Sequence, residues 1–371
     1  MHAKINTSMA SRKRDVNPIL AISLALLAAD FIVADDTTPI PEDKGQVEAW
    51  FKQNVKPLAE RKDTLNATLV AAEMNPKTIR VRPDGSGDFS TLTGAINSIP
   101  SGNKQRVIID LGSGEYTEKV MIERTRPFVT LKGDPNAMPI VQFSGTAREY
   151  GTVYSATVQV EGDYFVASNV IFKNTAPAPD GSQKGEQALA FRIGGNMATF
   201  YNCRFHGFQD TLCDDRGWHF FKNCYIEGTV DFIFGSGTSL YLNTELKVLK
   251  NGGFISAQAR NQDDTTGYSF VHCDITGMAQ DSFLGRAWSK MPKVAFLYCN
   301  IGAVINPLGW SDNNKPDRDT RTLEFREYKN TGPSSNLSER AKFTKPLTDA
   351  EALHYLSLGF IHGSSWLLPP P

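Results

Sequence analysis

Cysteine is scarce in this 371-residue chain, and its spacing argues against one common kind of site. The five cysteines never form a Cys-x-x-Cys pair, so a structural zinc site is not expected. An odd number also leaves at least one thiol unpaired within the chain, and the spacing assigns no disulfide.

The chain also lacks an excess of basic residues. Lys and Arg total 39 against 40 Asp and Glu, so the formal charge of −1 gives no indication of a nucleic-acid partner. Apolar residues make up 40% of the chain, enough for a large core, and charged residues make up 21%, which argues against wholesale disorder. The length is high for one ordinary domain, although single all-β domains also exceed 200 residues.

No apolar run of the chain is a good candidate for a membrane span. The apolar stretch at residues 18–34 is interrupted by Asp30. It follows three basic residues, Arg12, Lys13 and Arg14, and ends in small residues, a pattern typical of a cleaved secretory signal. Residues 1–34 are therefore predicted to be a signal segment, with an uncleaved signal anchor as the alternative.

Secretion agrees with two further features of the sequence. Asn66 and Asn336 each begin an Asn-x-Ser/Thr triplet, the acceptor for N-glycosylation. Removal of residues 1–34 takes away four basic and two acidic residues, which leaves a net charge near −3.

The middle of the chain contains a repeat. Related heptapeptides start at residues 168, 201, 222, 242, 271 and 297, at intervals of 33, 21, 20, 29 and 26 residues. Positions within a copy alternate as in a short β-strand, for example Cys203 with Phe205. Asn-Gly hairpin signals are too few to favour an up-and-down barrel or a sandwich. The pattern predicts an all-β fold, a parallel β-solenoid.

Helical patterns flank the repeat and are predicted to cover the solenoid. Residues 47–62 form one such pattern, interrupted by a proline, and residues 89–100 form a shorter one that could cap one end. Residues 347–358 begin with a capping box and are predicted to pack along the outside. The last residues, 367–371, are expected to fray.

Two aspartates fall at the same phase of adjacent repeats. Asp210 and Asp231 each lie three residues after a closing glycine and are 21 residues apart. On a solenoid they would stack on neighbouring coils, so one pKa should rise while the other stays low, which yields a general acid and an ionised nucleophile or base. Gln187 lies 22 residues before Gln209, so two amides could approach the pair as oxyanion donors.

Spacing alone leaves three interpretations of these aspartates open: solvated turn residues, a catalytic pair, or calcium ligands. Asp214 and Asp215 fit the turn and calcium interpretations better, because they lack a matched partner in the next repeat.

Nine motifs in order carry a resemblance to a known family. They are DGSGDFSTLTGAI, GEYTEKV, GTVYSAT, QALAFR, GFQDTL, GTVDFIFG, LGRAW, INPLGW and YKNTGP. The chain resembles plant pectin methylesterases (pectinesterases), especially the pollen type without an N-terminal inhibitor-like domain. The resemblance implies a single-stranded right-handed parallel β-helix for residues 79–371, including the C-terminal helical tail. Residues 35–78 would form a helical leader too short for an inhibitor-like domain.

The resemblance also implies roles for the aspartates and glutamines. Asp231 would attack the methyl-ester carbonyl of a galacturonate in homogalacturonan. Asp210 would act as general acid towards the departing methanol and then as base for the hydrolytic water. Gln187 and Gln209 would stabilise the negatively charged intermediate.

Three further residues receive roles from the same resemblance. Arg286 would hold Asp231 ionised and oriented, Trp288 would offer an aromatic face to the sugar, and Thr152 would contact the substrate. The family's usual LGRPW is LGRAW here, so Ala287 replaces a proline and the loop is expected to lose some rigidity.

The resemblance implies a secreted cell-wall enzyme that acts on pectin, with no cofactor and no metal. A proteinaceous pectinesterase inhibitor is a further expected partner, and neither a nucleic acid nor, after signal removal, a membrane is expected. The enzyme is expected to be a monomer, and its charge near −3 predicts weak retention on polyanionic pectin. The alternatives are a β-helix polygalacturonase or pectate lyase, or an inactive wall-binding homologue.

Overall fold

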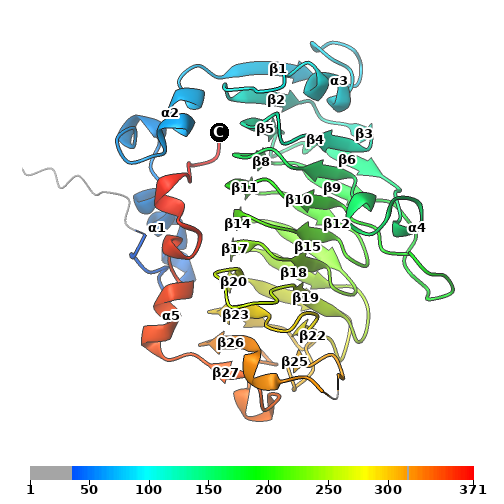
Figure 1. Cartoon of the computed structure of the whole chain (residues 1–371), viewed down its shortest axis with the longest axis vertical. Coiled ribbons are helices and arrows are strands. Elements are labelled where there is room, and N and C mark those ends of the chain that lie inside the picture. Colours follow the sequence, from blue (N-terminus) through cyan, green and yellow to red (C-terminus); the bar gives the residue numbers. More distant parts are fainter. Residues whose placement is uncertain (1–35, 316) are drawn as a thin grey trace, which may run out of the picture. The chain divides into compact units, whose positions relative to one another are not determined.

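The structure is a computed structural model that describes residues 36–315 and 317–371. The predicted signal segment, residues 1–34, lies outside the described residues. Within them, the chain winds as a right-handed parallel β-helix, and successive coils contribute strands to three parallel sheets (Figure 1). The predicted all-β solenoid is confirmed.

The eleven-strand sheet, sheet A, lies under the flanking helices. Its strands in order are β1 (Lys77–Val81), β2 (Val107–Leu111), β5 (Val129–Lys132), β8 (Val166–Ser168), β11 (Ala198–Tyr201), β14 (Trp218–Lys222), β17 (Thr238–Leu242), β20 (Gly267–Val271), β23 (Lys293–Leu297), β26 (Glu324–Tyr328) and β27 (Lys345–Pro346).

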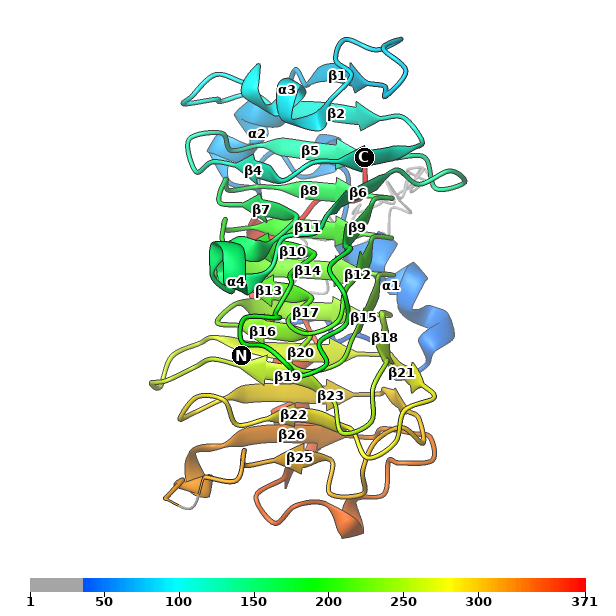
Figure 2. The same cartoon turned by 90° about the vertical axis from the view of Figure 1, so that its right-hand side faces the viewer.

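The two remaining sheets have eight strands each and run side by side along the stack (Figure 2). Sheet B contains β3 (Glu115–Thr117), β6 (Ile140–Phe143), β9 (Ile171–Asn174), β12 (Arg204–His206), β15 (Tyr225–Gly228), β18 (Glu245–Val248), β21 (Asp274–Gly277) and β24 (Asn300–Ile301). Sheet C contains β4 (Val120–Ile122), β7 (Val158–Val160), β10 (Phe191–Ile193), β13 (Leu212–Asp214), β16 (Ile233–Gly235), β19 (Phe254–Gln258), β22 (Phe283–Arg286) and β25 (Trp310–Ser311).

The sequence repeat marks the corner between sheets A and B as well as a strand. The second residue of each copy has a positive φ, in the order Asn169 58°, Asn202 49°, Asn223 56°, Asn243 52°, His272 53° and Tyr298 55°. Asparagine tolerates this left-handed conformation better than most residues, which accounts for its recurrence. Cys203 therefore lies in the corner and not in the strand, and both it and Phe205 are fully buried.

An aromatic stack fills the interior of the coils behind sheet A. Phe200, Phe221, Tyr241, Phe270 and Phe296 occupy equivalent positions on consecutive strands. Neighbouring rings are stacked with centroids 4.4 to 4.5 Å apart. This separation approaches the spacing of neighbouring strands, so ring packing and backbone hydrogen bonding specify the same register.

Both ends of the described chain cover the outer face of sheet A (Figure 1). The α-helices of the described residues, on this face and elsewhere, are α1 (Val47–Asn54), α2 (Ala67–Glu73), α3 (Leu92–Asn97), α4 (Ala147–Tyr150) and α5 (Asp349–Tyr355). The 3-10 helices are η1 (Lys44–Gln46), η2 (Leu58–Glu60), η3 (Val153–Ser155), η4 (Thr320–Thr322), η5 (Leu337–Glu339), η6 (Leu358–Ile361) and η7 (Gly363–Ser365).

Each helix predicted from the sequence is present, and the local signals that predicted it are seen in the structure. The helix that begins at residue 47 ends before Pro57, and the capping box of Thr348 and Glu351 starts α5. The buried face of α3 joins the interior cluster at the first coils. The expectation of a frayed end is wrong, because Leu367 is fully buried and the carbonyl of Leu368 accepts a hydrogen bond from the Tyr201 hydroxyl.

Two further findings, on disulfides and on membrane-spanning helices, concern the described residues alone. All five cysteines are free and buried. No helix in the described part of the chain combines the length and apolarity that crossing a bilayer requires.

Candidate active site

The corner between sheets B and C positions the two aspartates. Asp210 and Asp231 both adopt left-handed backbone conformations, with φ of 65° and 51°. Leu212 and Ile233 pair across neighbouring strands, and each lies two residues after its aspartate. The backbone N–H of Asp210 donates to the carbonyl of Val230 at 3.0 Å. The aspartates therefore lie on adjacent coils, as predicted from their spacing.

All seven predicted site residues meet at one hollow on the sheet C side. Its volume is about 290 Å³, and Phe234 and Ala257 complete its lining. The predicted residues in it are Thr152, Gln187, Gln209, Asp210, Asp231, Arg286 and Trp288. Residues that are far apart in sequence are thus brought together by the stacking of coils.

Arg286 holds Asp231 in a bidentate pair. Its Nε donates to Asp231 Oδ1 at 2.7 Å, and its Nη2 donates to Oδ2 of the same carboxylate. Nη1 donates to Asn313 Oδ1 at 3.1 Å, which fixes the far side of the guanidinium. The guanidinium carbon also lies 4.9 Å from the ring centroid of Phe254 and 5.1 Å from that of Trp288. Such a pair fixes both orientation and charge of the carboxylate.

The two carboxyl groups differ in acidity. Burial raises the pKa of Asp210 well above its ordinary value, the negative charge of Asp231 raises it further, and Arg286 opposes both effects. Burial also raises the pKa of Asp231, but the hydrogen bonds and charge of Arg286 counter that rise. Asp231 is thus the more acidic member, as predicted, although burial keeps its pKa from staying low.

The two amides are available beside the carboxylates. Gln187 and Gln209 lie on adjacent coils, since the N–H of Ala188 donates to the carbonyl of Gln209 at 3.2 Å. Among the described residues, neither carboxamide has a hydrogen-bond partner, so both retain N–H donors for a ligand.

Thr152 and Trp288 lie at the margins of the hollow. Thr152 lies between α4 and η3 as the N-cap residue of η3, and its carbonyl accepts from Ser155 Oγ at 2.7 Å. Trp288 is 54% exposed, which contradicts core packing as its role and leaves the ring free for a ligand.

Asp214 and Asp215, for which turn and calcium roles were open, both have side-chain partners within the protein. Asp214 is fully buried and contacts His219 Nδ1 at 2.5 Å and the Tyr241 hydroxyl at 2.6 Å. Asp215 forms an ion pair with Arg192 at 2.6 Å. Their carboxylates serve the packing of the coils.

Sequence reasoning missed the residues that support the site. Asn313 and Phe254 contact Arg286 from segments that carry no repeat signal, so nothing in their spacing could have identified them. Ala287, which stands where the family has proline, was expected to lessen the rigidity of its loop. Its N–H donates to the carbonyl of Ser311 at 2.8 Å, a bond that proline could not make and that ties the loop to β25.

The fold is a parallel β-helix, and its hollow brings two carboxyl groups and two amides together. A paired carboxylate, a second carboxyl group of higher pKa and two free amides suit acyl transfer at an ester.

Comparison with known proteins identifies the family. The family model described as Pectinesterase matches residues 78–364. "Putative pectinesterase 63" of Arabidopsis thaliana is 49% identical over 358 residues, 96% of this chain and 98% of that protein. "Pectinesterase 2" of Olea europaea is 50% identical over 349 residues, 93% of this chain and 95% of that protein. The chain belongs to the pectinesterase family and is a carboxylic ester hydrolase.

Solved structures agree with this assignment. The pectin methylesterase from carrot superposes with a TM-score of 0.73 at 30% identity, over 80% of this chain and 98% of that one. A pectin methylesterase mutant in complex with hexasaccharide IV superposes with a TM-score of 0.67 at 25% identity, over 78% of this chain and 98% of that one.

Proposed function

We propose that this chain removes methyl groups from pectin by using Asp231 as nucleophile and Asp210 as general acid and base. The observation that carries the proposal is the bidentate Arg286–Asp231 pair beside Asp210, a carboxyl group whose pKa is strongly raised. One carboxylate is thereby kept ionised and aimed, and the other is kept protonated for a leaving group.

The proposed first half-reaction forms a covalent intermediate. An Asp231 oxygen attacks the ester carbonyl carbon of a methylated galacturonate and forms a tetrahedral oxyanion. The free N–H groups of Gln187 and Gln209 donate to that oxyanion, and each such donor contributes roughly 3 kcal/mol in comparable sites. Asp210 then gives its proton to the methoxy oxygen as the C–O bond breaks, so methanol leaves and an acyl–Asp231 anhydride remains.

The second half-reaction restores the enzyme. Asp210, now ionised, takes a proton from a water molecule that attacks the galacturonoyl carbonyl of the anhydride. Collapse of the second tetrahedral intermediate releases the galacturonate carboxylate and returns Asp231 to its pair with Arg286. Asp210 finishes protonated, so the net reaction consumes one water and yields methanol and one acid group.

The amides favour this chemistry over the alternatives. A glycoside hydrolase needs two carboxyl groups on opposite sides of a glycosidic bond, and it has no need of two donors aimed at a carbonyl oxygen. Arg286 is fully engaged with Asp231 and Asn313, so it is not free to serve as the base of a lyase.

We also propose that the enzyme is secreted and acts in the cell wall as a monomer, where an inhibitor protein could bind. The catalytic region would extend over residues 79–371 behind a leader of residues 35–78. Asn66 and Asn336 are exposed, and each caps a helix through its Oδ1 atom. The amide nitrogens that would carry glycans are therefore not needed for the caps.

Product analysis tests the proposed function. Highly methylated pectin is incubated with wild type and with Asp231→Ala, and methanol, new reducing ends and unsaturated ends are followed in the same tubes. Methanol from wild type alone, without new chain ends, supports the proposal. New reducing or unsaturated ends would indicate a depolymerase, and no methanol from folded wild type would indicate a binding protein.

A further inference from the structure

A buried pair of polar side chains, Asp214 and His219, lies where the chain passes from sheet C to sheet A. Both side chains are fully buried, and Asp214 Oδ1 lies 2.5 Å from His219 Nδ1. Asp214 is the last residue of β13, the strand that begins two residues after Asp210. The pair therefore lies at the opposite end of this strand from the candidate active site.

The β-helix can close a coil without polar side chains at these two positions. Ile193 is the partner of Asp214 on the preceding coil, and Val160 is the partner of Ile193 on the coil before that. Ala198 stands on the preceding coil where this one has His219. Because a buried ion pair is rarely more stable than well-packed apolar residues, we expect the pair to fix an arrangement of the coils and to add little stability.

His219 bonds the pair to the coil that carries Gln187. Its Nε2 lies 2.9 Å from the carbonyl oxygen of Gly195, which follows β10 on that coil. Since a carbonyl oxygen can only accept, Nε2 carries a proton and donates it. A second proton lies between Nδ1 and the carboxylate of Asp214, because two unprotonated acceptors would repel each other at this distance.

Asp214 bonds the pair to the next two coils. The Tyr241 hydroxyl donates to Oδ2 at 2.6 Å, and the Tyr268 hydroxyl donates to the carbonyl of Asp214 at 3.1 Å. The N–H of Gly237 donates to the same carbonyl at 3.0 Å. Tyr241 and Gly237 belong to the coil that carries Asp231. Burial raises the pKa of Tyr241 well above its ordinary value and the negative charge of Asp214 raises it further, so the hydroxyl stays protonated and donates.

The pair is thus bonded to four consecutive coils, its own included. Three of these coils carry the two glutamines and the two aspartates of the candidate active site, and the fourth contributes Ala257 to the lining of the hollow. A displacement of about 1 Å at a reacting group can lower a rate by about 100-fold. Bonds that fix one of these coils relative to the next therefore bear on catalysis.

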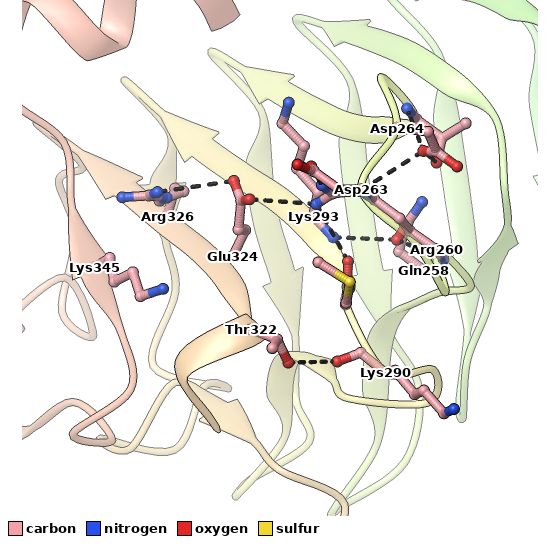
Figure 3. A network of polar contacts seen from close by, with 12 residues as sticks. Gln258, Arg260, Asp263, Asp264, Lys290, Lys293, Thr322, Glu324, Arg326 and Lys345 are labelled. Atoms are coloured by element: carbon pink, nitrogen blue, oxygen red, sulfur yellow. Dashed lines mark hydrogen bonds and ion pairs between the residues drawn. The ribbon is translucent and has the colours of Figure 1, made fainter. Parts of the chain in front are cut away.

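A second buried polar network joins the coils beyond the catalytic aspartates (Figure 3). It includes Gln258, which occupies the position of Asp214 two coils later and accepts from the N–H groups of Arg260 and Lys293 at 3.0 and 3.1 Å. The Arg260 side chain is balanced by Asp263 at 2.5 Å and Glu324 at 3.3 Å. This Arg260 network orders the later coils, whereas the pair joins the coils of the site.

We propose that Asp214, His219 and Tyr241 are positioning residues that hold the two catalytic aspartates and the two amides in one relative arrangement. The inference rests on the proposed function, because it gives these three residues a part in the same reaction. All three side chains are buried in the interior and none lines the hollow, so they act through the geometry of the groups that do. Loss of their bonds should therefore lower kcat and leave KM at its wild-type value.

The first test is Tyr241→Phe. The ring should stay stacked between Phe221 and Phe270, and only the hydroxyl is lost. We expect kcat for methanol release from methylated pectin to fall roughly tenfold, the effect of one hydrogen bond to a charged group, with KM unchanged. Tyr116→Phe is the matched control, because it removes a buried hydroxyl that donates to the carbonyl of Gly112 at 2.9 Å in the first coils. It should keep the wild-type kcat.

Two further variants separate bonding from packing. Asp214→Asn can keep every bond, since its amide N–H can donate to His219 Nδ1 and its carbonyl can accept from Tyr241, so kcat should stay within about threefold of wild type. The triple variant Asp214→Ile/His219→Ala/Tyr241→Phe takes the side chains that the preceding coil has at these positions. It should fold, as judged by circular dichroism, and lose roughly 100-fold in kcat.

Hydrogen exchange gives a readout that does not depend on activity. The N–H of Asp210 donates to the carbonyl of Val230 on the next coil, so it should exchange faster in Tyr241→Phe than in wild type or Tyr116→Phe. Wild-type kcat and wild-type exchange in Tyr241→Phe would overturn the positioning role. A triple variant that does not fold would also overturn it, because the pair would then serve the fold itself. Failure of the proposed function differs visibly, since wild type would then release no methanol while exchange at Asp210 would still respond to Tyr241→Phe.

Discussion

Asp210 and Asp231 occupy equivalent corner positions on adjacent coils, and their environments differ mainly through Arg286, which donates two hydrogen bonds to Asp231. Burial raises the pKa of both groups, so the arginine decides which one ionises first. At the scale of single residues, the difference between the two carboxyl groups therefore depends on one guanidinium and its orientation by Asn313.

Replacement of Arg286 should move the acid side of the pH profile. Arg286→Gln removes the hydrogen bonds and the charge that lower the pKa of Asp231, so that pKa should rise. If Asp231 attacks as an ionised nucleophile, as proposed, the acid limb of kcat/KM should shift to higher pH, with a loss of roughly 100-fold or more at the optimum. Arg80→Gln, an exposed arginine on β1, is the control. An acid limb that stays at the wild-type pH would contradict this assignment.

Burial of Asp210 should lower the stability of the folded protein when its carboxyl group ionises. Its folded-state pKa lies above its unfolded value, so the folded state binds more protons and stability falls as pH rises through the folded pKa. The isosteric Asp210→Asn removes that loss. The variant should be inactive yet more stable than wild type at pH 7, which a higher Tm would show.

Thermal unfolding measured as a function of pH tests the direction of this stability difference. Near pH 3 the carboxyl group is protonated in both states, so the advantage of Asp210→Asn should disappear. A variant that is less stable than wild type at pH 7 would show that the carboxylate is stabilised by its surroundings.

At the scale of elements, the corner between sheets A and B explains the repeat that the sequence displays. Four cysteines, Cys203, Cys224, Cys273 and Cys299, follow the left-handed corner residues and point into the core. Burial raises the pKa of Cys203 to about 12 and raises those of Cys224 and Cys299. The thiols of these three residues are thereby kept protonated.

Thiol titration tests this arrangement. The native protein should react slowly or not at all with a thiol reagent at pH 8, since thiolates are the reactive form. After denaturation without reductant, all five cysteines should react. Fewer than five would reveal a disulfide, and rapid labelling of the native protein would mean that the corners open to solvent.

The sequence was sufficient to predict the parts of the molecule that repeat, and it was insufficient for the loops that do not repeat. The stacking of Asp210 on Asp231 and the start of α5 at its capping box follow from spacing and local chemistry. The roles of the site residues came from the resemblance to the family. Asn313, Phe254 and the Arg260 network could not be predicted, because they depend on how loops of unequal length meet.

The described residues are held together mainly by two large hydrophobic clusters, one inside the coils and one outside sheet A. The outer cluster joins α1 and α2 to α5 and the residues that follow it, so both ends of the described chain cover the same face (Figure 1). Trp366 and Leu367 are buried there, and the Trp366 indole donates to the carbonyl of Ile361 at 2.9 Å.

Truncation after Ser365 should expose this face. Loss of two large buried side chains is expected to cost several kcal/mol and to increase the binding of an apolar dye. Removal of Pro370 and Pro371 alone is the control and should change the Tm little. An unchanged Tm after the longer truncation would mean that the tail does not support the fold.

The most direct test of the central claim is the rate of methanol release from highly methylated pectin by wild type and by the isosteric Asp231→Asn, with folding verified by circular dichroism. If Asp231 is the nucleophile, the variant should retain the wild-type fold and lose activity by about 10⁴-fold or more, as for other nucleophile replacements. A variant that keeps a tenth of the wild-type rate or more would contradict covalent catalysis by Asp231.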